Sequence, residues 1–105
     1  MKTLHAKFAV GQIIHHRKFD YRGVIVDVDA TYQGSDEWYE QMARSLPPKD
    51  QPWYHVLVHQ RSAESYVAER HLEPDDLLAP VEHPYVSVFF ESLQDGVYVG
   101  HQAIN

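Results

Sequence analysis

Histidine is the residue type in this sequence with the most capacity for chemistry, at eight of 105 residues. An imidazole can take up a proton near neutral pH, so His55, His59 and His71 are candidate general bases. The sequence contains no Gly-x-Ser-x-Gly motif, no phosphate-binding glycine loop and no cysteine. A histidine in or beside a strand is more often a packing residue with a satisfied hydrogen bond. We therefore predict no enzyme and no catalytic residue, and keep an enzyme using His55 or His71 as the weakest alternative.

The spacing of the histidines also argues against a bound metal. His15 and His16 are adjacent, so on a strand they point to opposite faces. His55 and His59 would share one face of a strand but lie about 13 Å apart along it. Neither spacing suits a closed metal site. The sequence therefore predicts no metal and no cofactor.

A basic and aromatic run forms the candidate contact to DNA. Its cations can contact phosphates and its aromatic rings can stack on bases. The residues are His15, His16, Arg17, Lys18, Tyr21 and Arg22. The alternative is a solvated turn whose aromatic residues cover the end of a barrel. The net charge of −6 favours that alternative, because phosphate neutralisation supplies much of the affinity for DNA.

A second set of aromatic and methionine residues is the candidate protein-interaction surface. Residues of these types are enriched at protein interfaces, and there are more of them than a small barrel needs inside. The set is Trp38, Tyr39, Met42, Phe89, Phe90 and Tyr98. The alternative is that most of them fill the core and pack helices onto the barrel. Those residues of the set that do not fill the core predict self-association into a homo-oligomer, an adaptor surface, or both.

These residues need a scaffold, and the stretch from Val10 to Tyr32 predicts a long β-hairpin. In its second half Val24, Val26 and Val28 recur with a period of two, and the alternate positions become acidic near the strand end. We expect further strands over 53–59, 64–68 and 97–99, the last closing the sheet, and helices over 36–45 and 84–93. A short sheet rich in β-branched residues removes its edges best by curling. The predicted fold is mainly β: a small SH3-like barrel of about five antiparallel strands with two short helical additions.

The length of 105 residues fits one domain. We expect a barrel core over 8–73, an acidic surface linker over 74–82, and a C-terminal helix and tail over 83–105. The sequence has no apolar run of membrane-spanning length and no segment typical of a signal peptide, so we expect a cytoplasmic protein without membrane contact.

Several motifs, in this order, resemble the heat shock protein HspQ family, also called the YccV-like or hemimethylated-DNA-binding domain family. They are Phe8-x-Val10-Gly11-Gln12, Phe19-x-Tyr21-Arg22-Gly23-Val24 through Asp29, Pro52-Trp53-Tyr54-His55-Val56, Tyr66-Val67-Ala68-Glu69, and the tail from His83-Pro84 to Tyr98. The resemblance implies an SH3-like barrel and no enzyme. It implies hemimethylated DNA as a ligand of some members. It also implies a heat-inducible partner of the Lon protease that favours degradation of aberrant replication-initiation protein.

The leading hypothesis is therefore a non-enzymatic stress protein that binds Lon protease, its substrates, or both. It would raise the local concentration of substrate or shift the protease towards an active state. The alternative is a DNA-binding protein that recognises hemimethylated sites. The resemblance assigns no individual functional residue.

Overall fold

The computed structural model describes residues 5–101 and confirms the predicted mainly β fold. Its elements are β1 (Ile13–His16), β2 (Arg22–Asp29), α1 (Asp36–Met42), β3 (Trp53–Val58), β4 (Glu64–Ala68), the 3₁₀ helix η1 (Glu69–His71), β5 (Leu72–Pro74), α2 (Val86–Phe89), β6 (Phe90–Gln94) and β7 (Val97–Gly100). None of the helices in this described range has the length and apolar character to span a bilayer.

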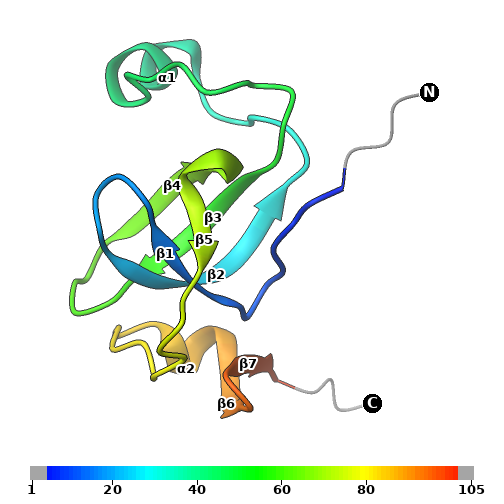
Figure 1. The fold of residues 1–105 in the computed structure, drawn as a ribbon, viewed down its shortest axis with the longest axis vertical. Helices are drawn as coiled ribbons and strands as arrows, with labels where there is room; N and C mark the ends of the chain where they lie inside the picture. Colours follow the sequence, from blue (N-terminus) through cyan, green and yellow to red (C-terminus); the bar gives the residue numbers. More distant parts are fainter. Residues whose placement is uncertain (1–4, 102–105) are drawn as a thin grey trace.

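The main sheet has five antiparallel strands in the order β4-β3-β2-β1-β5 and curls on itself (Figure 1). The register between β2 and β3 shifts between Ile25 and Asp27, which marks a β-bulge that increases the local twist. The sheet ends at β4 and β5, which follow one another through η1 but do not pair. The curled sheet is therefore open at the outer edge of β4.

Alternation along the strands divides the core into two main clusters. Neighbouring residues such as Ile13 and Ile14 face opposite sides of the sheet and belong to different clusters. The first cluster is Phe8, Ile14, Ile25, Tyr54, Val56, Val67 and Leu72. The second is Ile13, Val24, Leu57, Val81, Phe90 and Tyr98. Five of the six residues of β3 are buried, which fits its place between β4 and β2 in the sheet.

The predicted helix over 84–93 is wrong beyond Phe89, where α2 ends. Phe90 is extended and only 4% exposed, because its side chain is buried in the second core cluster. Asp95 and Gly96 both have positive φ angles (52° and 80°), which suits the two-residue turn that joins antiparallel strands. The turn pairs β6 with β7, so the segment 97–99 does not close the main sheet. Within residues 5–101 its one backbone bridge outside that hairpin joins Val97 to Gln12, while the Tyr98 side chain packs against the main sheet in the second core cluster.

The acidic segment 74–82 is exposed along most of its length but is anchored at two buried positions. Asp75 and Val81 are 7% and 4% exposed. Val81 belongs to the second core cluster, and its backbone N–H donates to the Tyr98 hydroxyl over 2.8 Å. A buried carboxylate needs a partner, and Arg22, distant in the sequence, supplies it. This segment therefore ties β6 and β7 to the main sheet.

Candidate functional site

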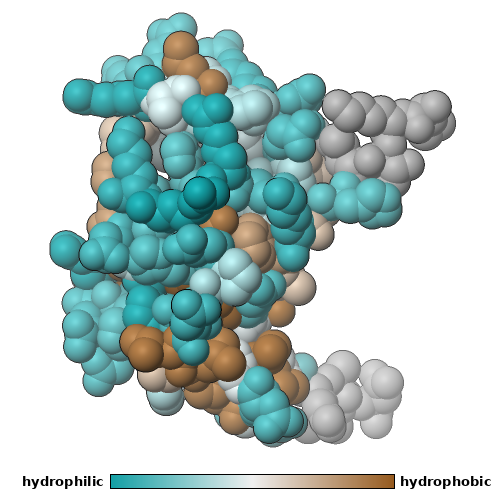
Figure 2. Space-filling model, viewed as in Figure 1, coloured by the Kyte–Doolittle hydropathy of each residue, from teal (hydrophilic) through white to brown (hydrophobic). Residues whose placement is uncertain are grey.

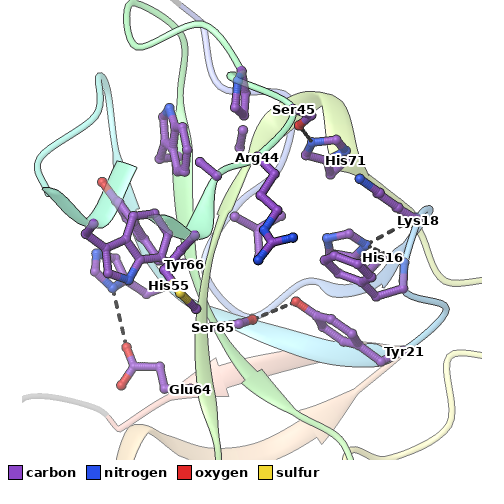
Figure 3. Close-up of a pocket in the computed structure, with 18 of the residues that line it drawn as sticks. His16, Lys18, Tyr21, Arg44, Ser45, His55, Glu64, Ser65, Tyr66 and His71 are labelled. Atoms are coloured by element: carbon purple, nitrogen blue, oxygen red, sulfur yellow. Dashed lines mark hydrogen bonds and ion pairs between the residues drawn. The ribbon is translucent and has the colours of Figure 1, made fainter. Parts of the chain in front are cut away.

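A groove of about 870 Å³ runs along β4 at the open edge of the sheet (Figure 3). All five residues of β4 line it. One wall comes from α1 and the loop after it, and the other from the turn between β1 and β2 together with η1. The groove thus combines side chains from three stretches that are far apart in the sequence.

Packed aromatic rings form the wall on the α1 side. The ring centroids of Trp53 and Tyr66 lie 5.2 Å apart, and those of Trp38 and Tyr66 lie 5.8 Å apart. Ser35 caps α1 by accepting a hydrogen bond from the Trp38 backbone N–H over 3.0 Å. The Trp53 indole donates to the Pro48 carbonyl over 3.1 Å, which holds the returning loop. This wall is preformed.

Tyr66 is a hydrogen-bond donor within this wall. Its hydroxyl donates to Asp29 Oδ2 over 2.7 Å. Burial, followed by that hydrogen bond, raises the pKa of Tyr66, so the phenol stays neutral. Tyr66 therefore fixes the orientation of the aromatic wall relative to β2.

The opposite wall is built around a buried histidine. The ring of His16 stacks on Phe19 at 4.7 Å and on His71 at 5.5 Å. His16 Nδ1 accepts hydrogen bonds from the backbone N–H groups of Lys18 and Phe19 over 3.1 and 3.0 Å. Burial, followed by the nearby charges of His71, His15 and Lys18, lowers the pKa of His16 to about 4. Burial and the charge of Arg70 also lower the pKa of His71, so both rings are neutral at pH 7.

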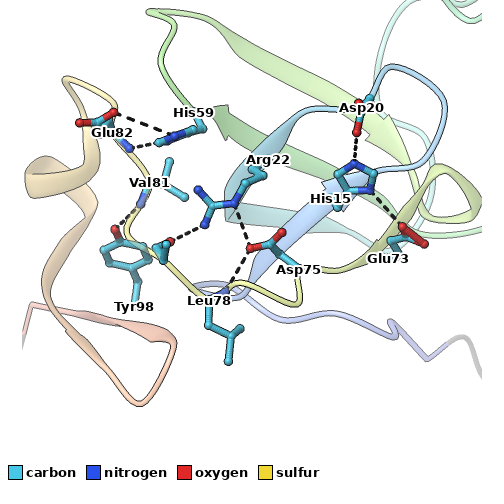
Figure 4. A network of polar contacts seen from close by, with 11 residues as sticks. His15, Asp20, Arg22, His59, Glu73, Asp75, Leu78, Val81, Glu82 and Tyr98 are labelled. Atoms are coloured by element: carbon cyan, nitrogen blue, oxygen red, sulfur yellow. Dashed lines mark hydrogen bonds and ion pairs between the residues drawn. The ribbon is translucent and has the colours of Figure 1, made fainter.

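Most of the predicted DNA contacts already have partners within the protein (Figure 4). His15 lies between Asp20 and Glu73, at 2.6 and 3.0 Å, and those hydrogen bonds raise its pKa. The Arg22 guanidinium donates to Asp75 Oδ2 over 2.9 Å and also to the Ala79 carbonyl.

The other residues of that set differ in their contacts. Tyr21 shares a hydrogen bond of 2.7 Å with Ser65. The Arg17 side chain is 4.0 Å from Glu73. Lys18 has no carboxylate partner within residues 5–101. DNA contact stays a prediction for these residues, but His16 and Arg22 could take part only by leaving buried contacts.

The predicted protein-interaction residues divide by exposure. Met42 and Phe89 are 65% and 42% exposed. Trp38 and Tyr39 are half-buried in the aromatic wall. Phe90 and Tyr98 are core residues, so in the folded protein they cannot contact a partner. The alternative that such aromatic residues fill the core therefore holds for these two.

A further group of exposed apolar side chains lies at the other end of the molecule, and Phe89 is its one member that the sequence predicted. Figure 2 shows apolar surface gathered at the bottom of the view, where Figure 1 places α2, β6 and β7. We call this the C-terminal apolar surface, and its residues are Leu77, Leu78, Val88, Phe89 and Val97. The sequence analysis gave the other members no binding role, because Leu77 and Leu78 lay in the expected linker and Val88 in the expected helix.

The three candidate bases all have hydrogen-bond partners. His71 Nε2 is 3.0 Å from the Ser45 hydroxyl, and His59 Nδ1 accepts from the Glu82 backbone N–H over 2.9 Å. His55 has its ring nitrogens 3.1 Å from Asp29 and 3.4 Å from Glu64. These contacts fit structural roles, and the absence of catalysis stays a prediction.

One group that sequence spacing missed could hold a metal ion. Oxygen or nitrogen atoms of Asp27, Asp29 and His55 lie within 4.8 Å of one another. The two aspartates share a face of β2, and after the β-bulge Asp27 is opposite His55 on β3 while Asp29 is opposite the neighbouring same-face residue Trp53. Asp29 already accepts hydrogen bonds from His55 and Tyr66, which satisfy it without an ion. We therefore assign no metal to this group.

Comparison with protein families gives one further finding. The family model described as "Hemimethylated DNA-binding protein YccV like" matches residues 6–97. The match begins before β1 and reaches the first residue of β7. It therefore includes the groove and every residue of the C-terminal apolar surface.

Proposed function

The chain belongs to the YccV-like family, named for hemimethylated DNA binding, and from this premise we propose that it is a non-enzymatic specificity factor for protein degradation. In this role it holds a segment of a damaged protein and presents that protein to a Lon-type protease. The observation that carries the proposal is the groove along β4, with its aromatic wall and its exposed apolar rim.

The rim of the groove supports a protein ligand. Phe19 and Met42 line it and are 68% and 65% exposed, from opposite walls. Large apolar side chains that gather at a concave surface mark binding sites more often than isolated ones do. Because the aromatic wall is already packed, a bound segment gains contacts without the entropic cost of ordering that wall.

A factor that brings substrate to a protease also needs a second surface. The C-terminal apolar surface lies at the end of the molecule opposite α1 (Figure 1). Two surfaces on one protein raise the local concentration of one partner near the other. We assign the groove to the substrate and the C-terminal apolar surface to the protease; self-association through that second surface is the competing use.

The proposal is tested by the rate at which purified Lon degrades several heat-damaged proteins, with and without this protein. We expect a higher initial rate and no cleavage by the protein alone. Met42→Ser should lower the stimulation. Leu46→Ser is its matched control, because Leu46 is 61% exposed but does not line the groove. Unchanged rates for every substrate would overturn the proposal.

Recognition of hemimethylated DNA is the second candidate, favoured by the family description and by two cations at the groove. Lys18 and Arg44 line it beside the exposed ring of Phe19, a combination that can contact a phosphate and a base. A salt titration with unmethylated, hemimethylated and fully methylated duplexes tests this candidate. If the protein recognises hemimethylated DNA, it should bind the duplex at physiological salt, and this binding should depend on methylation. The Lys18→Ala, Arg44→Ala double variant should bind the duplex more weakly. Undetectable binding, or binding independent of methylation, would remove it.

A further inference from the structure

The backbone of β4 has an unused edge. The register with β3 pairs Leu57 with Glu64 and Trp53 with Ala68. Just beyond the two ends of β4, the Val58 N–H donates to the Ala63 carbonyl, and the Glu69 N–H donates to the Pro52 carbonyl, both over 3.1 Å. In an antiparallel pair only alternate residues exchange hydrogen bonds with the partner strand. Ser65 and Val67 therefore bond to β3.

The remaining residues of β4, which are Glu64, Tyr66 and Ala68, direct their backbone N–H and C=O groups away from β3. Within residues 5–101, no hydrogen bond joins the backbone groups of Glu64 and Tyr66, or the Ala68 N–H, to another part of the chain. The Ala68 carbonyl is used, because Ala68 is the N-cap of η1 and accepts the first bond of that helix. Since every residue of β4 lines the groove, the free edge faces it. An unpaired edge of this kind is a template for another strand.

The charges at the groove restrict what such a strand can carry. Lys18 and Arg44 line the groove without an ion-pair partner among residues 5–101. Glu64 is the one acidic residue among the groove-lining residues, and it lies 3.4 Å from His55. His16 and His71 are neutral at pH 7. The groove thus has a local excess of positive charge on a chain whose net charge is −6.

We propose that β4 binds an extended peptide segment by strand addition, and that the segment carries apolar side chains together with carboxylates. The identity of the occupant as a protein rests on the proposed function. Main-chain hydrogen bonds to Glu64, Tyr66 and Ala68 hold the segment, and its side chains alternate between the two walls. One wall offers Trp38 and Met42, and the other offers Phe19 and Lys18. Recognition through the backbone accepts many sequences, as a factor for damaged proteins requires.

The proposal is tested with a fluorescent peptide of alternating Phe and Glu residues and two N-methylated versions of it. Strand addition uses the N–H groups of alternate peptide residues. One set of N-methyl groups should therefore weaken binding at least about tenfold, since it removes several hydrogen bonds at once. The other set should change binding less than about twofold. Equal effects of the two sets would overturn the proposal, as would binding of a short DNA duplex in place of the peptide.

A variant of the protein gives the reciprocal test. Ala68 has a φ of −68°, which proline adopts, and its N–H points into the groove rather than towards β3. Ala68→Pro removes one edge donor and should weaken the peptide about three- to tenfold. Ala68→Gly retains the N–H and is the control, and thermal unfolding of both variants verifies their fold. If Ala68→Pro folds and binds the peptide like the control, strand addition is excluded.

A third peptide tests the charge requirement. Replacing Glu by Lys throughout should weaken binding, and high salt should reduce that difference. Equal affinity for the two peptides at low salt would exclude a role for Lys18 and Arg44.

These experiments fail independently of the degradation assay. If the protein stimulates degradation but the peptide does not bind as an added strand, the proposed function stands and strand addition is rejected. If the N-methylated peptides behave as predicted but the protein does not stimulate degradation by Lon, strand addition stands and the proposed function is rejected.

Discussion

The two ends of this protein expose apolar side chains in different ways. At the groove the surface is concave, the edge of β4 has free backbone hydrogen-bonding groups, and Lys18 and Arg44 have no ion-pair partner in the part of the chain that the structure describes. At the C-terminal end β6 pairs with β7, and the exposed residues, such as Val88 and Phe89, stand out from α2. A concave strand edge can recognise any extended chain, whereas a raised set of side chains needs a surface of complementary shape.

The difference suggests how one small domain can serve two kinds of partner. In the proposed function, backbone recognition at β4 would tolerate variable substrates, and side-chain recognition at the C-terminal apolar surface would select one folded partner. Both ends share a core, because Phe90 and Tyr98 pack with Ile13, Val24 and Leu57 of the main sheet. Variants can therefore separate what supports the fold from what contacts partners.

Phe90 and Phe89 give the largest expected contrast in stability. Phe90 is 4% exposed in the core and Phe89 is 42% exposed. Phe90→Ala should lower the free energy of unfolding by about 3–5 kcal/mol, because it leaves a cavity. Phe89→Ala should lower it by less than about 1 kcal/mol. Urea denaturation followed by circular dichroism measures both, and similar losses would mean that the two rings do not have separate roles.

The ion pair of Arg22 and Asp75 is the next largest effect and connects the two ends. Arg22→Ala leaves a buried carboxylate without its partner and should lower the free energy of unfolding by about 3 kcal/mol. Arg17→Ala, at a side chain that is 62% exposed, should change it by less than about 0.5 kcal/mol. The same denaturation experiment compares them. A loss as small for Arg22→Ala as for Arg17→Ala would restore Arg22 as a candidate DNA contact.

Acid should weaken the groove end through His16. Its folded-state pKa of about 4 lies below the ordinary 6.5, so the unfolded chain binds more protons between these values. The stabilising effect of a neutral His16 is fully present above about pH 6.5 and is lost as the pH falls towards 4. This corresponds to about 2 kcal/mol between pH 7 and pH 5.

The raised pKa of His15 has the opposite sign, because protonation of that ring in the folded state stabilises the fold at low pH. His16→Asn isolates the contribution of His16. Asparagine retains an acceptor for the Lys18 and Phe19 N–H groups but does not titrate. Unfolding free energies measured from pH 7 to pH 4 should fall less steeply in the variant. An unchanged slope would show that His16 is not the acid-sensitive group.

Met42→Ser should have the smallest effect on stability, below about 0.5 kcal/mol, because Met42 is 65% exposed. It should nevertheless weaken the Phe/Glu peptide about fivefold, through loss of apolar contact at the groove rim. Fluorescence anisotropy measures this, with Leu46→Ser as the control that should bind normally. Equal weakening by both variants would place the peptide outside the groove.

Local patterns in the sequence predicted much of the fold. The alternation over β2 and the apolar run of β3 predicted both strands, and the prediction for β4 has the same bounds as the strand. The pattern over 84–93 failed because helical spacing was given more weight than Asp95-Gly96, a strong hairpin signal. Burial of Phe90 in the common core then favours the strand over the helix.

The site was harder to predict because it depends on contacts between distant residues. Arg22 and Asp75 are 53 positions apart, so composition alone made Arg22 a surface cation and Asp75 part of a linker. The groove brings residues of 16–21 against residues of 38–47 and 64–71. No local pattern encodes that juxtaposition. Met42 and Lys18, which the sequence named as candidates from residue type alone, do line the groove, and their binding roles stay predictions.

The central claim is that the two ends bind different partners, and one binding experiment tests it most directly. Wild-type protein, Met42→Ser and Phe89→Ser are each titrated against immobilised Lon and against the fluorescent Phe/Glu peptide. The account predicts that Met42→Ser loses affinity for the peptide and keeps affinity for Lon, while Phe89→Ser does the reverse. If both variants weaken the same partner and leave the other unchanged, the two ends do not have separate roles.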